Sequence, residues 1–387
     1  MIINKRKFLA LIVVLVLIFI TACTNDKSNN NAFAERQGNQ ENQESVSVEE
    51  NQDEKEIINE NEAEEEAPIE EQQDHPPVDL KALKVNELGK IMILMYHDIG
   101  EPEDIWVRTP ENFRKDLQTL YDKGYRAISM KDYIEGNIDT PPGTTPVVIT
   151  FDDGTKGQFN ILDEDGEFVI DPDSAVGILE EFNKEHPDFG LKATFYVFYP
   201  TPFRQEQWIT EKFQYLVERG MEIGNHCYNH ENLRMDFNTK ESRDAQFIQE
   251  ALGKNVKATQ EILPGYEVDS LALPYGASPK DEELYNYVIK GSFEGTQYHN
   301  KAILLVGSNP ARPSYHVNTN MAKIPRIRAS EMETENTGLY DWLEYFDNHP
   351  EERYISDGDL STISFPKELE EYLDKEKIGD KLIQAYE

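Results

Sequence analysis

Two short polar stretches of the chain carry residue types that suit metal-assisted hydrolysis. The first is the pair Asp152 and Asp153, directly after an apolar run, and the second holds His226 and His230 at positions i and i+4. One carboxylate and two imidazoles suit a divalent cation with open coordination positions. The other carboxylate is left for acid–base chemistry beside that cation. These residues predict a metal-dependent hydrolase site.

Alternating strand and helix patterns indicate how these residues are brought together. Strands are expected over 91–96, 125–130, 146–150, 193–198, 221–224, 270–273 and 302–306, and a short strand or loop over 323–327. Helices are expected from 110 to Gly124, after Ser174, and over 207–219, 240–263, 281–290 and 331–346. This alternation predicts a parallel sheet with helices outside, and about seven repeats favour a (β/α)7-type barrel over an open sheet. The polar residues follow strands and would meet at one rim.

The first 22 residues have the pattern of an export signal. Basic residues 5–7 precede an apolar run over 8–20, which is shorter than the roughly 20 residues of a membrane span. The run ends in Ile-Thr-Ala-Cys at 20–23, which resembles the bacterial lipoprotein lipobox and implies a lipid on Cys23. We expect a protein anchored to the cell membrane on its extracytoplasmic face; a plain anchoring helix is the alternative.

The composition limits the partners and the domain organisation. A formal net charge of −36 over 387 residues argues against nucleic acid or anionic lipid as a partner. Residues 23–84 are acidic and too polar to bury a core, so we expect a disordered tether there, with an acidic binding arm as the alternative. If Cys23 carries lipid, no intrachain disulfide is available. The folded domain is expected over 85–387, as a monomer, with the charged segment after 346 folding back on it.

Three motifs together resemble a known family. Thr-Phe-Asp-Asp-Gly at 150–154, His-x-x-x-His at 226–230 and Pro-Tyr-Gly at 274–276 are similar to those of the NodB-type polysaccharide deacetylases, carbohydrate esterase family 4. The resemblance implies a distorted barrel and metal-dependent removal of N- or O-acetyl groups from glycans. It also implies roles for individual residues: Asp153, His226 and His230 as metal ligands, Asp152 as catalytic base, and the backbone N–H of Tyr275 as an oxyanion donor.

A further stretch narrows the resemblance. Leu-Met-Tyr-His-Asp-Ile at 94–99 is similar to the start of the biofilm poly-N-acetylglucosamine deacetylases. That resemblance implies that His97 is the general acid, with His299 and His316 as alternatives. The expected substrate is an N-acetylated hexosamine polymer, either secreted poly-N-acetylglucosamine or cell-wall peptidoglycan.

The chain departs from the family pattern at two positions. The family often has Arg two residues before the Pro of Pro-Tyr-Gly, where this chain has Ala272. We hypothesise that Arg326 supplies this guanidinium to Asp152 from another strand; a surface-paired arginine is the alternative. Cys227 replaces the Ser or Thr common after the first metal histidine and is expected to be a packed side chain, with a role as a soft ligand as the alternative. Most of five aromatic residues are expected in the core, with a sugar groove as the alternative: Tyr196, Phe198, Tyr199, Phe203 and Trp208.

The ligand set leaves the metal open. Zinc is the default expectation, and cobalt, nickel and manganese also suit one carboxylate with two imidazoles. Two other functions remain at this point. One is a catalytically weak, glycan-binding structural lipoprotein of the cell envelope, and the other is an O-acetyl glycan esterase.

Overall fold

The computed structural model describes residues 78–162 and 166–387. The expected signal sequence, Cys23 and most of the expected tether lie outside the described residues. Within the described part of the chain, no helix combines the length and the hydropathy needed to cross a bilayer.

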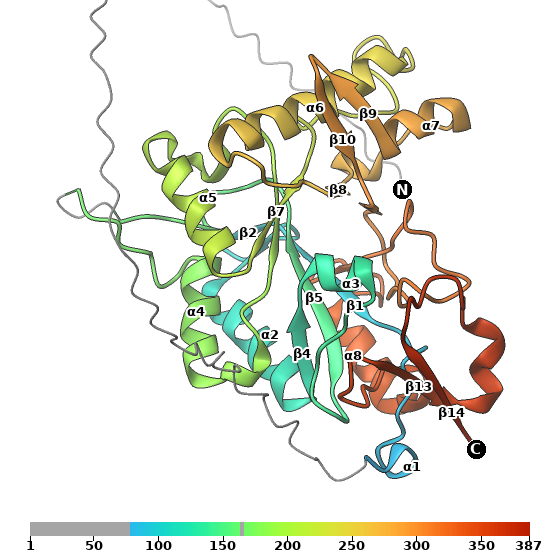
Figure 1. Ribbon diagram of the computed structural model, residues 1–387. Coiled ribbons are helices and arrows are strands. Elements are labelled where there is room, and N and C mark those ends of the chain that lie inside the picture. Colours follow the sequence, from blue (N-terminus) through green and yellow to red (C-terminus); the bar gives the residue numbers. More distant parts are fainter. Residues whose placement is uncertain (1–77, 163–165) are drawn as a thin grey trace, which may run out of the picture. The chain divides into compact units, whose positions relative to one another are not determined.

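Eight parallel strands form a curled central sheet (Figure 1). They are β1 Met92–Tyr96, β4 Tyr125–Ile128, β5 Thr145–Phe151, β6 Thr194–Val197, β7 Glu222–Asn225, β8 Ser270–Ala272, β11 Ala302–Leu304 and β12 Ile327–Arg328. The order is β11-β8-β7-β6-β5-β1-β12, and β4 pairs with the first half of β5. The carboxyl ends of all these strands therefore point to the same rim.

The segment that leads into β12 links the two ends of this sheet. Leu304 in β11 forms a parallel bridge with Ile324, whose backbone N–H donates to the carbonyl oxygen of Ile303 at 2.8 Å. β12 follows directly and pairs with β1. The sheet is thus curled into a distorted partial barrel, as the sequence predicts, and residues 321–328 cover its open side.

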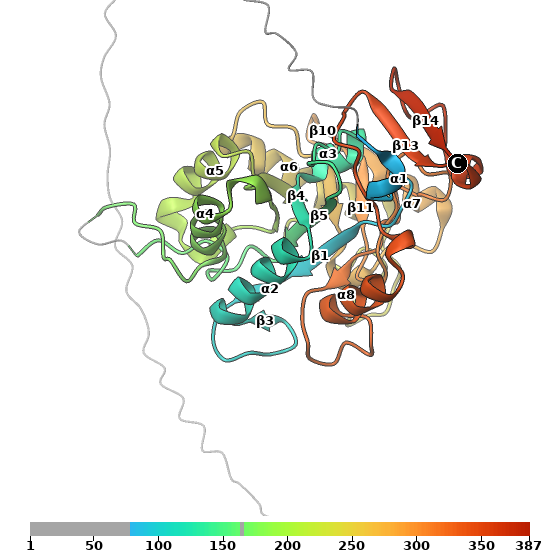
Figure 2. The same ribbon diagram turned by 90° about the horizontal axis from the view of Figure 1, so that it is seen from below.

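Helices pack on the outer face of the sheet (Figures 1 and 2). They are α2 Pro110–Asp122, α4 Ala175–Glu185, α5 Ile209–Glu218, α6 Ala245–Ile262 and α8 Leu339–Asn348. Three of them begin at a capping side chain, since Thr109, Ser174 and Asp244 each accept a hydrogen bond from the backbone N–H three residues later. Capping therefore sets where these helices start relative to the strands.

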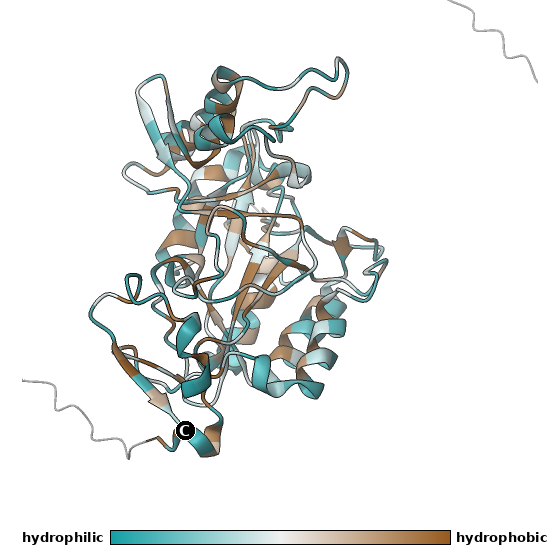
Figure 3. Cartoon of the chain, turned by 90° about the vertical axis from the view of Figure 1, so that its right-hand side faces the viewer, coloured by the Kyte–Doolittle hydropathy of each residue, from teal (hydrophilic) through white to brown (hydrophobic). Residues whose placement is uncertain are grey.

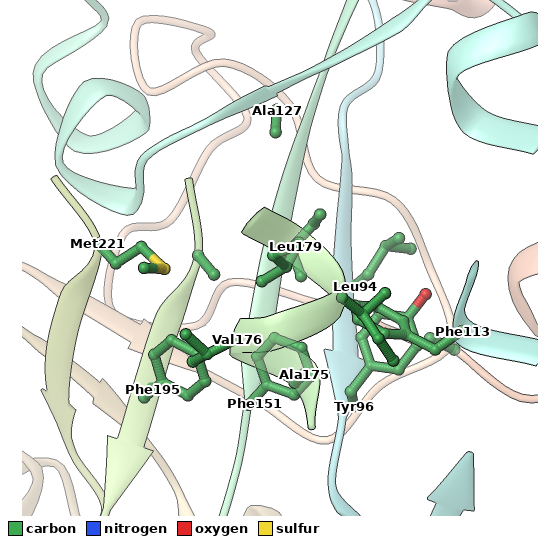
Figure 4. Packing of buried hydrophobic residues seen from close by; sticks show 14 of the residues in the cluster. Leu94, Tyr96, Phe113, Ala127, Phe151, Ala175, Val176, Leu179, Phe195 and Met221 are labelled. Atoms are coloured by element: carbon green, nitrogen blue, oxygen red, sulfur yellow. The ribbon is translucent and has the colours of Figure 1, made fainter. Parts of the chain in front are cut away.

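Aromatic and aliphatic side chains fill the space between the sheet and α4. Phe151 and Phe195 stack with their ring centroids 5.0 Å apart, and α4 lays Val176 and Leu179 over them (Figure 4). The central strands are largely hydrophobic, whereas the helices are hydrophobic on one side (Figure 3). β5 is buried at every position, as expected of a parallel strand covered on both faces. This packing fixes the positions of the strand ends, and it therefore also positions the site residues, which directly follow those ends.

Several elements differ from those expected. The strand expected over 125–130 divides into β4 and the helix α3 Met130–Glu135, because Ser129 and Asp132 form a capping box. The helices expected from 240 and 331 begin later, at Ala245 and Leu339. The remaining elements are α1 Leu80–Leu83, β2 Asp98–Ile99, β3 Val107–Arg108, α7 Glu282–Ile289, and the antiparallel hairpin of β9 Lys290–Phe293 and β10 Thr296–His299.

The C-terminal segment folds back on the start of the domain, as expected. β13 Thr362–Pro366 pairs in parallel with β14 Leu382–Tyr386. The buried carboxylate of Glu87 accepts hydrogen bonds from the backbone N–H groups of Ser364 at 2.8 Å and Asp357 at 3.3 Å. These bonds hold the first and last parts of the domain together.

Candidate active site

Asp153, His226 and His230 converge at the rim, after the ends of β5 and β7. The Nε2 atoms of His226 and His230 lie 3.3 and 3.2 Å from the same oxygen, Oδ1 of Asp153. That oxygen is buried and has no hydrogen-bond donor among the described residues. A buried carboxylate oxygen needs a donor or a cation to offset its lost hydration. We refer to these three residues as the triad.

Hydrogen bonds to the other ring nitrogens orient the two imidazoles. Nδ1 of His226 lies 2.8 Å from the carbonyl oxygen of Ala272. A carbonyl only accepts, so Nδ1 carries the proton and Nε2 presents a lone pair. Nδ1 of His230 lies 3.0 Å from the hydroxyl of Tyr275, which can accept in the same way. The triad therefore presents three acceptor atoms to one point, an arrangement that fits a divalent cation.

The charge of the triad is consistent with a ligand role. Burial raises the pKa of Asp153, but the imidazoles of His226 and His230, when their Nε2 atoms carry protons, outweigh it and hold that pKa well below its ordinary range. Asp153 is therefore ionised at neutral pH, which is the form that binds a cation.

The backbone around the triad is left-handed at several non-glycine residues. The φ angles are 78° at Asp153, 57° at Cys227, 56° at His230 and 59° at Tyr275. Such angles are uncommon for residues with a Cβ and cost on the order of 1–3 kcal/mol each. Two buried amides hold the turn at Cys227: Asn225 accepts from its N–H at 2.8 Å, and Asn255 donates to its carbonyl at 2.7 Å. Cys227 itself is fully buried and packed, as expected.

Asp152 lies beside the triad and is held by Arg326. The guanidinium of Arg326 donates from Nη1 and Nη2 to the two carboxylate oxygens of Asp152, at 2.7 Å each. Burial raises the pKa of Asp152, but Arg326 outweighs it and the pKa is lowered. Asp152 is therefore an ionised carboxylate with a fixed orientation.

Arg326 reaches this position from the segment that covers the open side of the barrel. It also donates to the carbonyl oxygen of Leu305 at 3.0 Å and to Oγ1 of Thr150 at 3.1 Å. The side chain is completely buried. The alternative of a surface-paired arginine is therefore wrong, and the structure places Arg326 where the hypothesis requires it.

His97 follows the end of β1, the strand that pairs with β5. Burial lowers the pKa of His97, while the carboxylates of Asp152 and Asp153 act in the opposite direction. The ring packs against Trp106, with the centroids 4.5 Å apart. The other two histidines considered for the same role lie elsewhere: His299 ends β10, and His316 stacks on Tyr372.

A buried glutamine connects the ends of β1 and β5. Nε2 of Gln158 donates to the carbonyl oxygen of His97 at 2.8 Å and also to that of Asp152. These two acceptors fix the orientation of the amide, since its oxygen cannot face a carbonyl. Gln158 thus holds the backbones of His97 and Asp152 at a set spacing. Nothing in the sequence around Gln158 indicates this contact.

The aromatic residues divide between the core and the rim. Tyr196, Tyr199 and Phe203 are buried, which confirms the core interpretation for these three. Phe198 is half-buried and lies 5.4 Å from the ring of His230. Two exposed rings near the site, those of Trp106 and Phe237, carry no motif and were not predicted from the sequence.

Residues 139–288 match the family model described as polysaccharide deacetylase. This part of the chain is therefore similar to the polysaccharide deacetylases. The match supports a hydrolase that removes acetyl groups. The matched span includes the triad, Asp152 and Tyr275, whereas His97 and Arg326 lie outside it.

Several solved structures resemble the chain. The Streptococcus pyogenes deacetylase PplD in complex with acetate is 18% identical, with 66% of this chain and 97% of that one covered and a TM-score of 0.47. BC0361, a polysaccharide deacetylase from Bacillus cereus, is 18% identical, with 66% and 68% covered and a TM-score of 0.46. IcaB from Ammonifex degensii is 17% identical, with 65% and 96% covered and a TM-score of 0.44. No curated protein sequence matches the chain.

Proposed function

We propose that the protein removes N-acetyl groups from an extracellular N-acetylhexosamine polymer, with a divalent cation held by Asp153, His226 and His230. The observation that supports this most is the convergence of three acceptor atoms beside an ionised carboxylate that Arg326 fixes in place. A ligand cluster next to a separate base is the arrangement that hydrolysis assisted by a metal requires.

The base is Asp152. A divalent cation at the triad would polarise the acetyl carbonyl and lower the pKa of a water molecule. Asp152 takes the proton from the attacking water. Because Arg326 donates to both oxygens of Asp152, it keeps the carboxylate ionised and prevents its rotation. A base that is already oriented adds little reorganisation cost to the reaction.

His97 and Tyr275 act on the other side of the tetrahedral intermediate. The backbone N–H of Tyr275 donates to the oxyanion, a contribution of about 3 kcal/mol for one such donor in other hydrolases. His97 protonates the departing amine, which is a poor leaving group without that proton. The ring of Trp106 covers one face of His97 and reduces its contact with water.

The substrate is a neutral or partly cationic glycan. The chain carries a net charge of −36, which disfavours anionic polymers. The position of His97 near the start of the domain favours poly-N-acetylglucosamine, and peptidoglycan is the second candidate. Zinc is the default cation, and cobalt, nickel or manganese would suit the same ligands.

The deciding experiment measures acetate release from N-acetylglucosamine oligomers before and after treatment with a chelator. We expect release that the chelator abolishes and that one of zinc, cobalt, nickel or manganese restores. Release that persists after complete chelation would contradict the metal site. Glycan binding without any acetate release would favour the structural lipoprotein, and release from acetylated xylan alone would favour the O-acetyl esterase.

The proposed location is the extracytoplasmic face of the cell membrane, through a lipid on Cys23. The Cys23→Ala variant, expressed in a bacterium that lipidates exported proteins, tests this. We expect the wild-type protein in the membrane fraction with a mass increase for the lipid, and the variant without that mass. An unmodified wild-type protein would contradict the anchor without affecting the enzymatic proposal.

A further inference from the structure

Exposed aromatic rings are concentrated at the candidate active site. Four aromatic side chains of the described residues are exposed: Trp106, Phe237, Tyr275 and Tyr287. Trp106 packs on His97, Tyr275 contacts His230, and Phe237 contacts Tyr275. Only Tyr287, on α7, lies away from these contacts. Exposed apolar surface of this kind commonly marks a binding site.

Phe237 belongs to a loop between β7 and α6 that is braced from within. Oδ1 of Asp236 accepts from the N–H groups of Asn238 at 2.7 Å and Thr239 at 2.9 Å. Oδ2 of Asp236 pairs with Arg243 at 3.0 Å. The loop therefore has a defined shape, and Phe237, which is 51% exposed, is held at its tip.

The ring of Phe237 continues a series of rings that begins at the triad. Its centroid lies 5.1 Å from that of Tyr275 at an interplanar angle of 89°, an edge-to-face contact. The Tyr275 ring lies 4.6 Å from that of His230, and its hydroxyl is 3.0 Å from Nδ1 of His230. Tyr275 and Phe237 together form an exposed aromatic surface directly beside the metal ligands.

The charges of the loop favour an uncharged ligand. Arg243 is engaged by Asp236 and lies over the ring of Phe247 at 3.9 Å. Nε of Arg234 donates to the carbonyl oxygen of Ser278 at 3.0 Å. The loop arginines are thus bound internally, and the aromatic surface itself carries no charge. A pyranose ring, which has an apolar C–H face, suits such a surface.

We propose that Phe237 and Tyr275 form a subsite that binds one pyranose unit of the glycan, next to the unit whose acetyl group lies at the triad. This inference rests on the proposed function for the identity of the glycan. It has one direct consequence: substrates that extend over Phe237 are bound and hydrolysed better than substrates that end before it.

The test compares two substrates in the Phe237→Ala variant. One is the N-acetylglucosamine pentamer, and the other is 4-nitrophenyl acetate, which is too small to need the subsite. We expect kcat/KM for the pentamer to fall about five- to tenfold, as expected for one lost aromatic contact, and that for the ester to stay unchanged. Phe237→Trp should keep the activity on the pentamer, and the control Tyr287→Ala should change neither.

Equilibrium binding of the pentamer to the same variants separates the two proposals. Pentamer binding that weakens in Phe237→Ala supports the subsite, even if the wild-type protein released no acetate and the proposed function failed. Binding and turnover of the pentamer that are both unchanged in Phe237→Ala would overturn the subsite. An equal loss of activity on the pentamer and the ester would overturn it too, because it would show a general effect on the active site.

Discussion

Two buried arginine–aspartate pairs of the domain are bidentate, one through Nη1 and Nη2 of Arg326 and the other through Nε and Nη2 of Arg108. Arg326 donates to both oxygens of Asp152 at 2.7 Å, and Arg108 donates to both oxygens of Asp116 at 2.9 and 2.6 Å. None of the four side chains is more than 3% exposed. The first pair lies at the rim beside the triad, and the second lies between β3, α2 and α8.

The two pairs differ in their other partners. Asp116 also accepts from the hydroxyls of Tyr96 at 3.1 Å and Tyr340 at 2.9 Å. Asp152 has no side-chain donor except Arg326 among the described residues. Burial raises the pKa of Asp116 in spite of Arg108, whereas at Asp152 Arg326 outweighs burial and the pKa is lowered.

This comparison indicates which property distinguishes the proposed base from a structural carboxylate. Burial and a bidentate arginine are common to both pairs, so neither property distinguishes them. The Asp116 carboxylate is surrounded by donors, and its network connects α2 to α8. The Asp152 carboxylate is bound on one side and keeps lone pairs for a reacting proton. Free lone pairs beside a ligand cluster are therefore the informative feature.

The largest expected effect is that of Asp152→Asn on turnover. The amide cannot accept a proton, so we expect acetate release to fall about a thousandfold, in the range for loss of a general base. The amide keeps one oxygen for Arg326 but leaves the buried guanidinium without its charge partner, so we expect a folded protein that is less stable by about 3 kcal/mol. Acetate release and circular dichroism check this. Activity within tenfold of wild type in a folded variant would contradict the assignment of Asp152 as base.

The Arg326→Met variant tests whether the arginine orients the base. We expect turnover to fall about ten- to a hundredfold, with a smaller change in KM, because the carboxylate loses both its charge partner and its fixed orientation. Arg326→Lys should recover part of the lost turnover, since lysine restores the positive charge but not the bidentate hydrogen bonds. Unchanged turnover in a folded Met variant would reject the role.

The matched change at the other pair is Asp116→Asn, and its effect should fall on stability. Arg108 keeps its ion pairs with Glu103 at 2.6 Å and Glu331 at 3.2 Å, but the amide disrupts a buried network of donors around position 116. We therefore expect a loss of about 3 kcal/mol in the free energy of unfolding. Urea unfolding measures it. Turnover per folded molecule should stay close to that of wild type. A large loss of turnover with unchanged stability would remove the distinction between the two pairs.

The smallest expected effect concerns His316, a buried group outside both pairs. Burial and the neighbouring Arg312 lower the pKa of His316 to about 4, and its Nδ1 accepts from the N–H of Asn318 at 3.1 Å. Between pH 6.5 and 4 the imidazole of His316 is protonated in the unfolded chain but stays neutral in the folded protein. Stability should therefore fall by about 2 kcal/mol as the pH falls through this window.

Urea unfolding at several pH values checks this prediction. The His316→Gln variant should lose this part of the pH dependence, because its amide oxygen can accept from Asn318 without titrating. His299→Gln, at an exposed position of β10, is the control and should leave the dependence unchanged. Identical pH profiles for wild type and His316→Gln would show that another group is responsible.

The main strands and helices can be predicted from the sequence because their signals, apolar runs and capping residues, lie within the elements themselves or next to them. Continuous apolar runs identify β1 and β5, and Ser174 and Asp281 mark the starts of α4 and α7. The late starts of α6 and α8 and the β9–β10 hairpin depend on contacts with other elements, which spacing does not show. The short helix α3 has a capping signal at Ser129 that the longer apolar pattern obscured.

Some residues of the candidate site can be predicted from short motifs, whereas others are recognised only from contacts between distant segments. The triad and Asp152 are readable because their motifs are contiguous. Arg326 could be proposed from an unexplained charge in an apolar segment, but only the barrel shows that it reaches Asp152. Gln158 and Phe237 could not be found, because their roles arise from contacts between distant segments and not from their neighbours in sequence.

The late position of Arg326 in the chain bears on how the enzyme is made. The emerging polypeptide acquires Asp152 and the triad well before it acquires residues 321–328, which connect β11 to β1. Until that segment docks, the base lacks its guanidinium. We therefore expect a nascent or C-terminally truncated chain to reach competence for cation binding earlier than competence for hydrolysis.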